Sequence, residues 1–193
     1  MSAQIFERWA DSLVQEGIIS REDAGLYSYG LEQGLLLALN IGTALLIGLL
    51  LDEFVACVIF LACFLPLRAM AGGYHARTPF RCYLLGMVMV TGVLAMIKWF
   101  PWTMSEALIA VGIASIVIWL LAPVENENKL LDVEEKAEYQ KKTRVLLVSI
   151  WILLVEVFMQ KNVQGSSALD MSIIVTAVML VLGNIKRRIL KRI

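Results

Sequence analysis

The sequence has one histidine and three cysteines among its 193 residues, and no two cysteines stand in a CxxC spacing. A structural zinc site needs several Cys or His ligands at short, regular spacings, so we expect no metal and no cofactor. The chain also lacks an excess of charge, because seventeen Lys and Arg residues balance seventeen Asp and Glu residues. Without a net positive charge, the chain has no general attraction for nucleic acid.

The N-terminus, MSAQIFERWADSLVQEG, lacks the basic region and apolar core of a cleaved signal peptide. What the chain has instead is apolar residues, which make up 59% of it and give a mean hydropathy of +0.74. A soluble domain cannot carry this composition without large exposed apolar patches. The composition therefore predicts a membrane protein whose spans are themselves the targeting signal.

Six apolar runs each approach the roughly 20 residues that a helix needs to cross a bilayer. We therefore expect an all-α polytopic membrane protein with about six transmembrane helices. Four spans, with two runs re-entrant or interfacial, are the alternative. The runs cover about 33–51, 54–70, 82–100, 104–122, 144–160 and 168–185.

Residues 1–30 differ from the rest, because apolar residues recur at helical spacing among charged ones. This pattern is typical of one or two amphipathic helices on a membrane surface, with a break near Gly17 and a cap at Ser20. We expect a single membrane domain over 1–193. It comprises this segment, a helical bundle over 31–185 and a basic tail over 186–193, which favours anchoring to anionic lipid.

The basic residues gather in alternate loops. If the N-terminus is cytoplasmic, fifteen of the seventeen fall on the cytoplasmic side, and only Lys98 and Lys161 fall outside. The positive-inside rule therefore predicts a multi-pass protein of the plasma membrane with both termini in the cytoplasm.

The stretch RAMAGGYHARTPFRC, residues 68–82, holds the only histidine, one cysteine and three arginines. Gly72 and Gly73 are suited to end one helix, since glycine adopts the left-handed cap conformation freely. Thr78 and Pro79 are suited to start the next, as N-cap and first helical residue. The stretch therefore predicts a tight joint between two helices on the cytoplasmic side.

Cys82 follows this start closely. The partial positive charge of the helix N-terminus, together with Arg77 and Arg81, favours the thiolate, which is the nucleophilic form. His75 would lie about 10.5 Å away along one continuous helix, but the break lets it fold back toward the sulfur as a base. Backbone amides around Phe80 and Arg81 are then candidates to stabilise an oxyanion.

Structural interpretations stay open for these residues. A single His and Cys near a membrane surface are often structural, and Cys57 and Cys63 lie inside an apolar run as small buried residues do. Arg68 either extends to the lipid headgroups or pairs with a substrate carboxylate.

Arg68, the run GGYHA over 72–76, Cys82, and Ala122-Pro123-Val124 followed by Asn128-Lys129 resemble the accessory gene regulator B (AgrB) family of membrane-embedded cysteine endopeptidases. The resemblance implies catalysis by His75 and Cys82 at the cytoplasmic face. It also implies supporting or substrate-binding roles for Arg68, Gly73 and Lys129, and a homodimer.

The implied substrate is an AgrD-type precursor of a quorum-sensing peptide. Family membership would mean that a Cys thioester acyl-enzyme forms as the C-terminal tail is removed, and that a thiolactone or lactone macrocycle is then released. Two alternatives remain. A small transporter or channel would need more polar residues inside the spans, and a non-catalytic membrane partner would leave the His75 and Cys82 pair unexplained.

Overall fold

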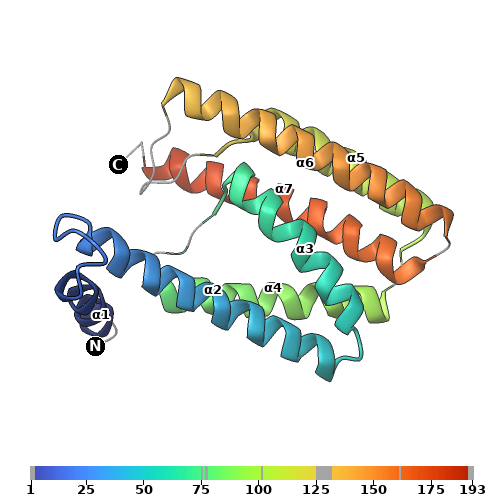
Figure 1. The fold of residues 1–193 in the computed structure, drawn as a ribbon. Helices are drawn as coiled ribbons and strands as arrows, with labels where there is room; N and C mark the ends of the chain where they lie inside the picture. Colours follow the sequence, from blue (N-terminus) through green and yellow to red (C-terminus); the bar gives the residue numbers. More distant parts are fainter. Residues whose placement is uncertain are drawn as a thin grey trace. The chain divides into compact units, whose positions relative to one another are not determined.

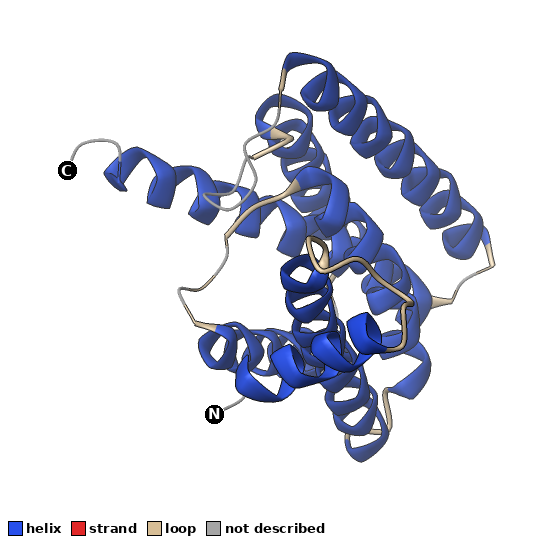
Figure 2. Cartoon of the chain, turned by 60° about the vertical axis from the view of Figure 1, so that its left-hand side comes forward, coloured by secondary structure: helices blue, strands red, loops and turns tan. Residues whose placement is uncertain are grey.

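The computed structural model describes residues 3–74, 76, 78–100, 102–124, 132–160 and 162–190. These ranges form seven α-helices and contain no β-strand (Figures 1 and 2), which confirms the all-α prediction. The helices are α1 (Ala3–Gln15), α2 (Ala24–Leu50), α3 (Phe54–Ala71), α4 (Pro79–Trp99), α5 (Met104–Leu121), α6 (Val133–Met159) and α7 (Val163–Leu190).

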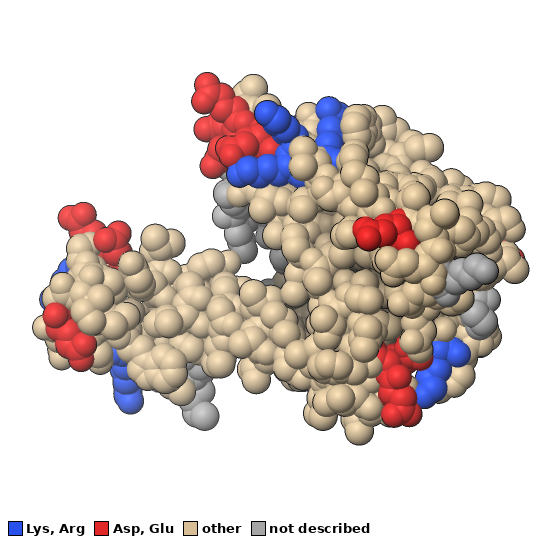
Figure 3. All heavy atoms as spheres, turned by 45° about the vertical axis from the view of Figure 1, so that its right-hand side comes forward, with Lys and Arg blue, Asp and Glu red and all other residues tan. Residues whose placement is uncertain are grey.

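Five of the helices, α2, α3, α4, α5 and α7, are long and apolar enough to cross a membrane. Helix α6 also contains the expected apolar run, but Lys142 and Arg144 lie in the middle of the helix and Glu156 lies in its last turn. On the face in Figure 3, the helix surfaces are largely uncharged and the charged side chains gather near helix ends. The chain is thus a polytopic membrane protein, with five candidate spans among the residues that the structure describes.

The chain divides into two compact units, residues 1–43 and 44–193. In the first unit, the Asp23 amide donates to the Ser20 hydroxyl at 3.2 Å, as expected for a cap, and α2 begins at the next residue. Helix α2 then continues without a break into the first apolar run. Residues 24–30 therefore belong to a long helix and not to a separate surface helix.

The core of the second unit lies around α7, which packs against α3, α4, α5 and α6. Helices α5 and α6 run side by side (Figure 1). Trp151 of α6 donates from its indole N–H to the Ser115 hydroxyl at 2.9 Å, and the Arg144 guanidinium lies 4.4 Å from the centre of the Trp119 ring. These contacts fix the helices that surround α7.

The loops of the second unit gather at two ends. At one end, the Lys98 ammonium donates to the Leu51 carbonyl at 2.6 Å, and the Gln164 amide donates to the buried Glu53 carboxylate at 3.2 Å. At the other end, the turn after α3 meets residues 122–124 and the C-terminal half of α7. This grouping agrees with the predicted alternation of loops.

Candidate active site

Helix α3 ends where the sequence predicts. Gly72 is the C-cap, with φ +76° and ψ −151°, and its amide donates to the Arg68 carbonyl at 3.0 Å. Gly73 also has a positive φ, of +126°. Residues with a side chain rarely adopt this part of conformational space, so the two glycines permit the sharp turn that carries the chain away from α3.

Helix α4 also begins as predicted. Thr78 is the N-cap, Pro79 is the first helical residue, and the Thr78 hydroxyl accepts from the Arg81 amide at 3.4 Å. The Arg81 amide, one of the two candidate oxyanion donors, is therefore already hydrogen-bonded to Thr78. Cys82 is thus in the first turns of α4, where free backbone amides and the helix dipole are closest.

Arg68 folds back over the turn that follows its own helix. Its guanidinium donates to the carbonyl oxygens of Gly72 and Tyr74. A planar guanidinium presents several donors in a fixed fork, so one side chain can bind two consecutive parts of the turn. Arg68 is half-buried.

The other side of the turn is bound to two distant parts of the chain. The Val124 amide donates to the Ala71 carbonyl at 2.9 Å, so that Gly72 and Val124 form an isolated parallel bridge. The Tyr74 amide donates to the carbonyl of Met179, in α7, also at 2.9 Å. The turn is therefore held from three directions.

Two glycines allow the close approach to α7. A Cβ on Gly73 would lie 2.9 Å from the Met179 carbonyl oxygen, and one on Gly183 would lie 2.6 Å from the carbonyl carbon of Gly73. Real Cβ atoms almost never come this close to backbone. The backbones of the turn and of α7 are in direct contact at Gly73 and Gly183.

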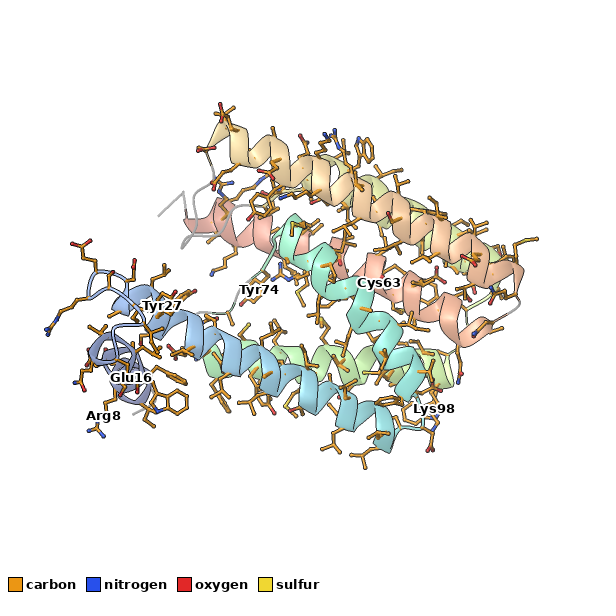
Figure 4. The ribbon with its side chains drawn as sticks, in the orientation of Figure 1. Arg8, Glu16, Tyr27, Cys63, Tyr74 and Lys98 are labelled. Carbon is orange, nitrogen blue, oxygen red and sulfur yellow. The ribbon has the colours of Figure 1, made fainter. Side chains whose placement is uncertain are left out.

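The three cysteines differ in exposure. Cys57 is buried and its thiol donates to the Ala44 carbonyl at 3.3 Å, Cys63 is partly buried in the middle of α3, and Cys82 is exposed. Figure 4 shows Cys63 within α3 and Tyr74 in the turn beyond the end of that helix. Of the three thiols, Cys82 alone is open to a large substrate.

Three residues of the sequence prediction, His75, Arg77 and Lys129, lie outside the described residues. The neighbours of His75 are described, and Tyr74 is fixed to Arg68 and to Met179 as stated above.

A cavity of about 410 Å³ lies beside the turn. Its lining residues come from the turn, from α4 and from α7, and are Tyr74, Ala76, Arg81, Leu85 and Lys186. The Lys186 ammonium lies 5.7 Å from the centre of the Tyr74 ring. The cavity therefore combines two basic side chains, Arg81 and Lys186, with apolar walls. Arg81 directly precedes Cys82 in the sequence.

The contribution of α7 to this site was not predictable from the sequence. Lys186 was assigned to a lipid-anchoring tail, and Gly183 carried no signal beyond being a small residue in an apolar run. Their contacts join residues more than a hundred positions apart, and local spacing holds no information about such pairs.

An exposed thiol at a helix N-terminus, beside a turn that carries a histidine, has the parts needed for nucleophilic catalysis. Among the described residues, no group of three or more His, Cys, Asp or Glu side chains could hold a metal ion. Fold and site together define an α-helical, polytopic membrane protein with a candidate thiol site at one end of its bundle.

The family described as Accessory gene regulator B matches residues 6–182. The match covers most of the chain, and the protein belongs to the AgrB family. No solved structure matches the chain significantly.

Two curated relatives come from Clostridium perfringens. The chain is 28% identical to the "Putative AgrB-like protein" of strain SM101 over 134 residues, which cover 66% of this chain and 61% of the relative. It is 25% identical to "Putative AgrB-like protein 2" of strain 13 over 152 residues, which cover 75% of this chain and 71% of the relative. The aligned part thus spans about three fifths of the first relative and somewhat more of the second.

Proposed function

We propose that this protein is a membrane cysteine endopeptidase that cleaves the C-terminal tail from an AgrD-type precursor peptide and promotes its cyclisation. The observation that carries the proposal is the exposure of Cys82 in the first turns of α4, beside a turn held by Arg68 and α7. Membership of the AgrB family supports the substrate class.

In the proposed reaction, the Cys82 sulfur attacks the carbonyl carbon of the scissile peptide bond while His75 accepts the thiol proton. Collapse of the tetrahedral intermediate breaks the C–N bond, and His75 gives the proton to the leaving amine. The products of this half are a thioester on Cys82 and the free C-terminal tail.

A cysteine or serine side chain of the peptide then attacks the thioester carbonyl. Its proton passes through His75 to the Cys82 sulfur, and the peptide leaves as a thiolactone or lactone ring. Transfer to an internal nucleophile requires that water be kept from the acyl-enzyme, which favours a site at the membrane surface.

The remaining residues have supporting roles in this proposal. Arg68 and Gly73 position the turn, because the guanidinium binds the turn carbonyls and Gly73 lies against α7. The amides of Phe80 and Arg81 are the proposed oxyanion donors, and Phe80 is the better one because the Arg81 amide already bonds Thr78. Lys129 is proposed to contact the substrate.

The proposal also includes a homodimer in the plasma membrane, bound lipid, and both termini in the cytoplasm. The end of the bundle that carries Cys82 is then the cytoplasmic end, where a newly made precursor arrives. The positive-inside distribution of Lys and Arg supports this orientation.

The test is co-expression with an AgrD-type precursor peptide, comparing wild type with Cys82→Ser and His75→Ala. Both variants should lose cleavage and cyclisation, whereas Cys63→Ser should keep them. Mass spectrometry of the wild-type protein should detect a peptide adduct on Cys82. Cleavage by Cys82→Ser at the wild-type rate would refute the mechanism.

A further inference from the structure

A second cavity lies at the opposite end of the bundle from Cys82. Its volume is about 240 Å³, and a water molecule needs only about 10–15 Å³ of such space. It is a partly open pocket lined by α5, α6, α7 and the segment before α5, and its lining residues are mostly apolar. The cavity therefore has room for a small organic molecule.

One acidic side chain faces this apolar space. Asp170 of α7 lines the cavity although the residue is only 8% exposed. Among the described residues, no hydrogen bond or ion pair reaches its carboxylate. The nearby Ser166 hydroxyl, which also lines the cavity, instead donates to the Val163 carbonyl at 3.0 Å. A buried acid inside a membrane span is costly and calls for a cationic partner.

Aromatic rings surround the same space. Trp102, Trp151 and Phe158 line the cavity together with Asp170. The bond from the Trp151 indole to Ser115 fixes the orientation of that ring. The faces of aromatic rings attract organic cations, and the attraction is stronger where water is excluded. The Asp170 carboxylate and the aromatic rings thus both favour an organic cation as the ligand.

We infer that the cavity between α5, α6 and α7 is a binding site for a small organic ammonium ion. The ammonium group pairs with the Asp170 carboxylate and the apolar substituent packs among the indole rings. The site is separate from Cys82, because Asp170 and Lys186 stand about 24 Å apart along α7 at a rise of about 1.5 Å per residue. The inference does not depend on the proposed peptidase activity.

The test uses the full chain in nanodiscs of phosphatidylglycerol, with 4-fluorobenzylammonium as the probe and its neutral isostere 4-fluorobenzyl alcohol as the reference. Fluorine NMR titrations measure the dissociation constant of each. We expect the wild type to bind the ammonium probe at least about tenfold more tightly than the alcohol, since a hydrogen bond to a charged group is worth more than this factor.

Two variants make the result specific. Asp170→Asn should lose the preference for the ammonium probe while it still binds the alcohol, which shows that the cavity is intact. Glu156→Gln, which removes an exposed acid that does not line the cavity, should keep the preference. Equal binding of the two probes by the wild type, or a preference that survives in Asp170→Asn, would overturn the inference.

A second arm separates a lipid ligand from a free amine. In nanodiscs that contain phosphatidylethanolamine, competition from its ammonium headgroup should weaken probe binding if the natural ligand is an aminolipid. Unchanged probe binding in those nanodiscs identifies a free organic amine as the class of ligand.

Discussion

Gly183 in α7 and Gly73 in the turn after α3 touch through their backbones, and a methyl group on Gly183 would lie 2.6 Å from the Gly73 carbonyl carbon. The contact is next to the hydrogen bond between the Tyr74 amide and the Met179 carbonyl. The position of the turn is therefore set by a helix far away in the sequence, and this relationship can be tested by single substitutions.

Replacing Gly183 with alanine should displace the turn and slow precursor cleavage. A displacement of about 1 Å in catalytic groups can cost roughly 100-fold in rate, so we expect a loss of at least about tenfold. The measurement is the rate of tail release in membranes with equal amounts of protein. Gly112→Ala in α5 is the matched control, because nothing lies within 4 Å of a Cβ there. Equal rates for the two variants would argue against the contact.

Arg68→Lys should inactivate the protein nearly as much as Arg68→Ala. A lysine ammonium is a single point charge and does not reproduce the planar fork that binds the Gly72 and Tyr74 carbonyls. The same cleavage assay measures the effect, and Arg188→Lys on the exposed face of α7 is the control. Full activity of Arg68→Lys would show that only the positive charge matters.

Cys82 should react with a maleimide faster than Cys57 and Cys63 by at least about tenfold, because accessible thiols react and buried ones are inert. Mass spectrometry of digested protein measures the labelled fraction of each cysteine over time. A membrane-impermeant maleimide, applied to inside-out and right-side-out vesicles, also tests the orientation. Labelling of Cys82 in inside-out vesicles alone agrees with a cytoplasmic site.

Gly72→Ala should destabilise the protein more than Gly17→Ala does. Both glycines have a positive φ, which costs a residue with a side chain about 1–3 kcal/mol. A Cβ on Gly72 would also collide with the Val124 carbonyl oxygen, whereas nothing lies within 4 Å of a Cβ on Gly17. Unfolding by SDS titration measures both variants. Equal destabilisation by the two variants would mean that residues 122–124 can move away from the added methyl group without a loss of stability.

The joint between α3 and α4 was predictable from sequence, because caps and helix ends are local. Gly72, Thr78 and Pro79 act through their own conformations and nearest neighbours. Family membership was also predictable, since the motif residues are read in order along the chain. The confirmed features are those that depend on short stretches of sequence.

The support behind the joint was not predictable in the same way. The residues alone gave two interpretations of Arg68, headgroup contact or substrate carboxylate, and neither describes its bonds to the turn carbonyls. Only the family resemblance suggested a supporting role for this side chain. The roles of Met179, Gly183 and Lys186 depend on how α7 packs, which no local pattern encodes. The charges of α6 also make its span weaker than a count of apolar residues suggested.

The bond from Tyr74 to Met179 has a consequence for the order in which the site is completed. The ribosome makes the turn early and its anchor on α7 late, so a nascent chain that ends before Met179 carries Cys82 without the support that holds its neighbours. Cys82 is thus synthesised well before the part of α7 that supports the neighbouring turn. The support of the turn is complete only after the last helix has been assembled.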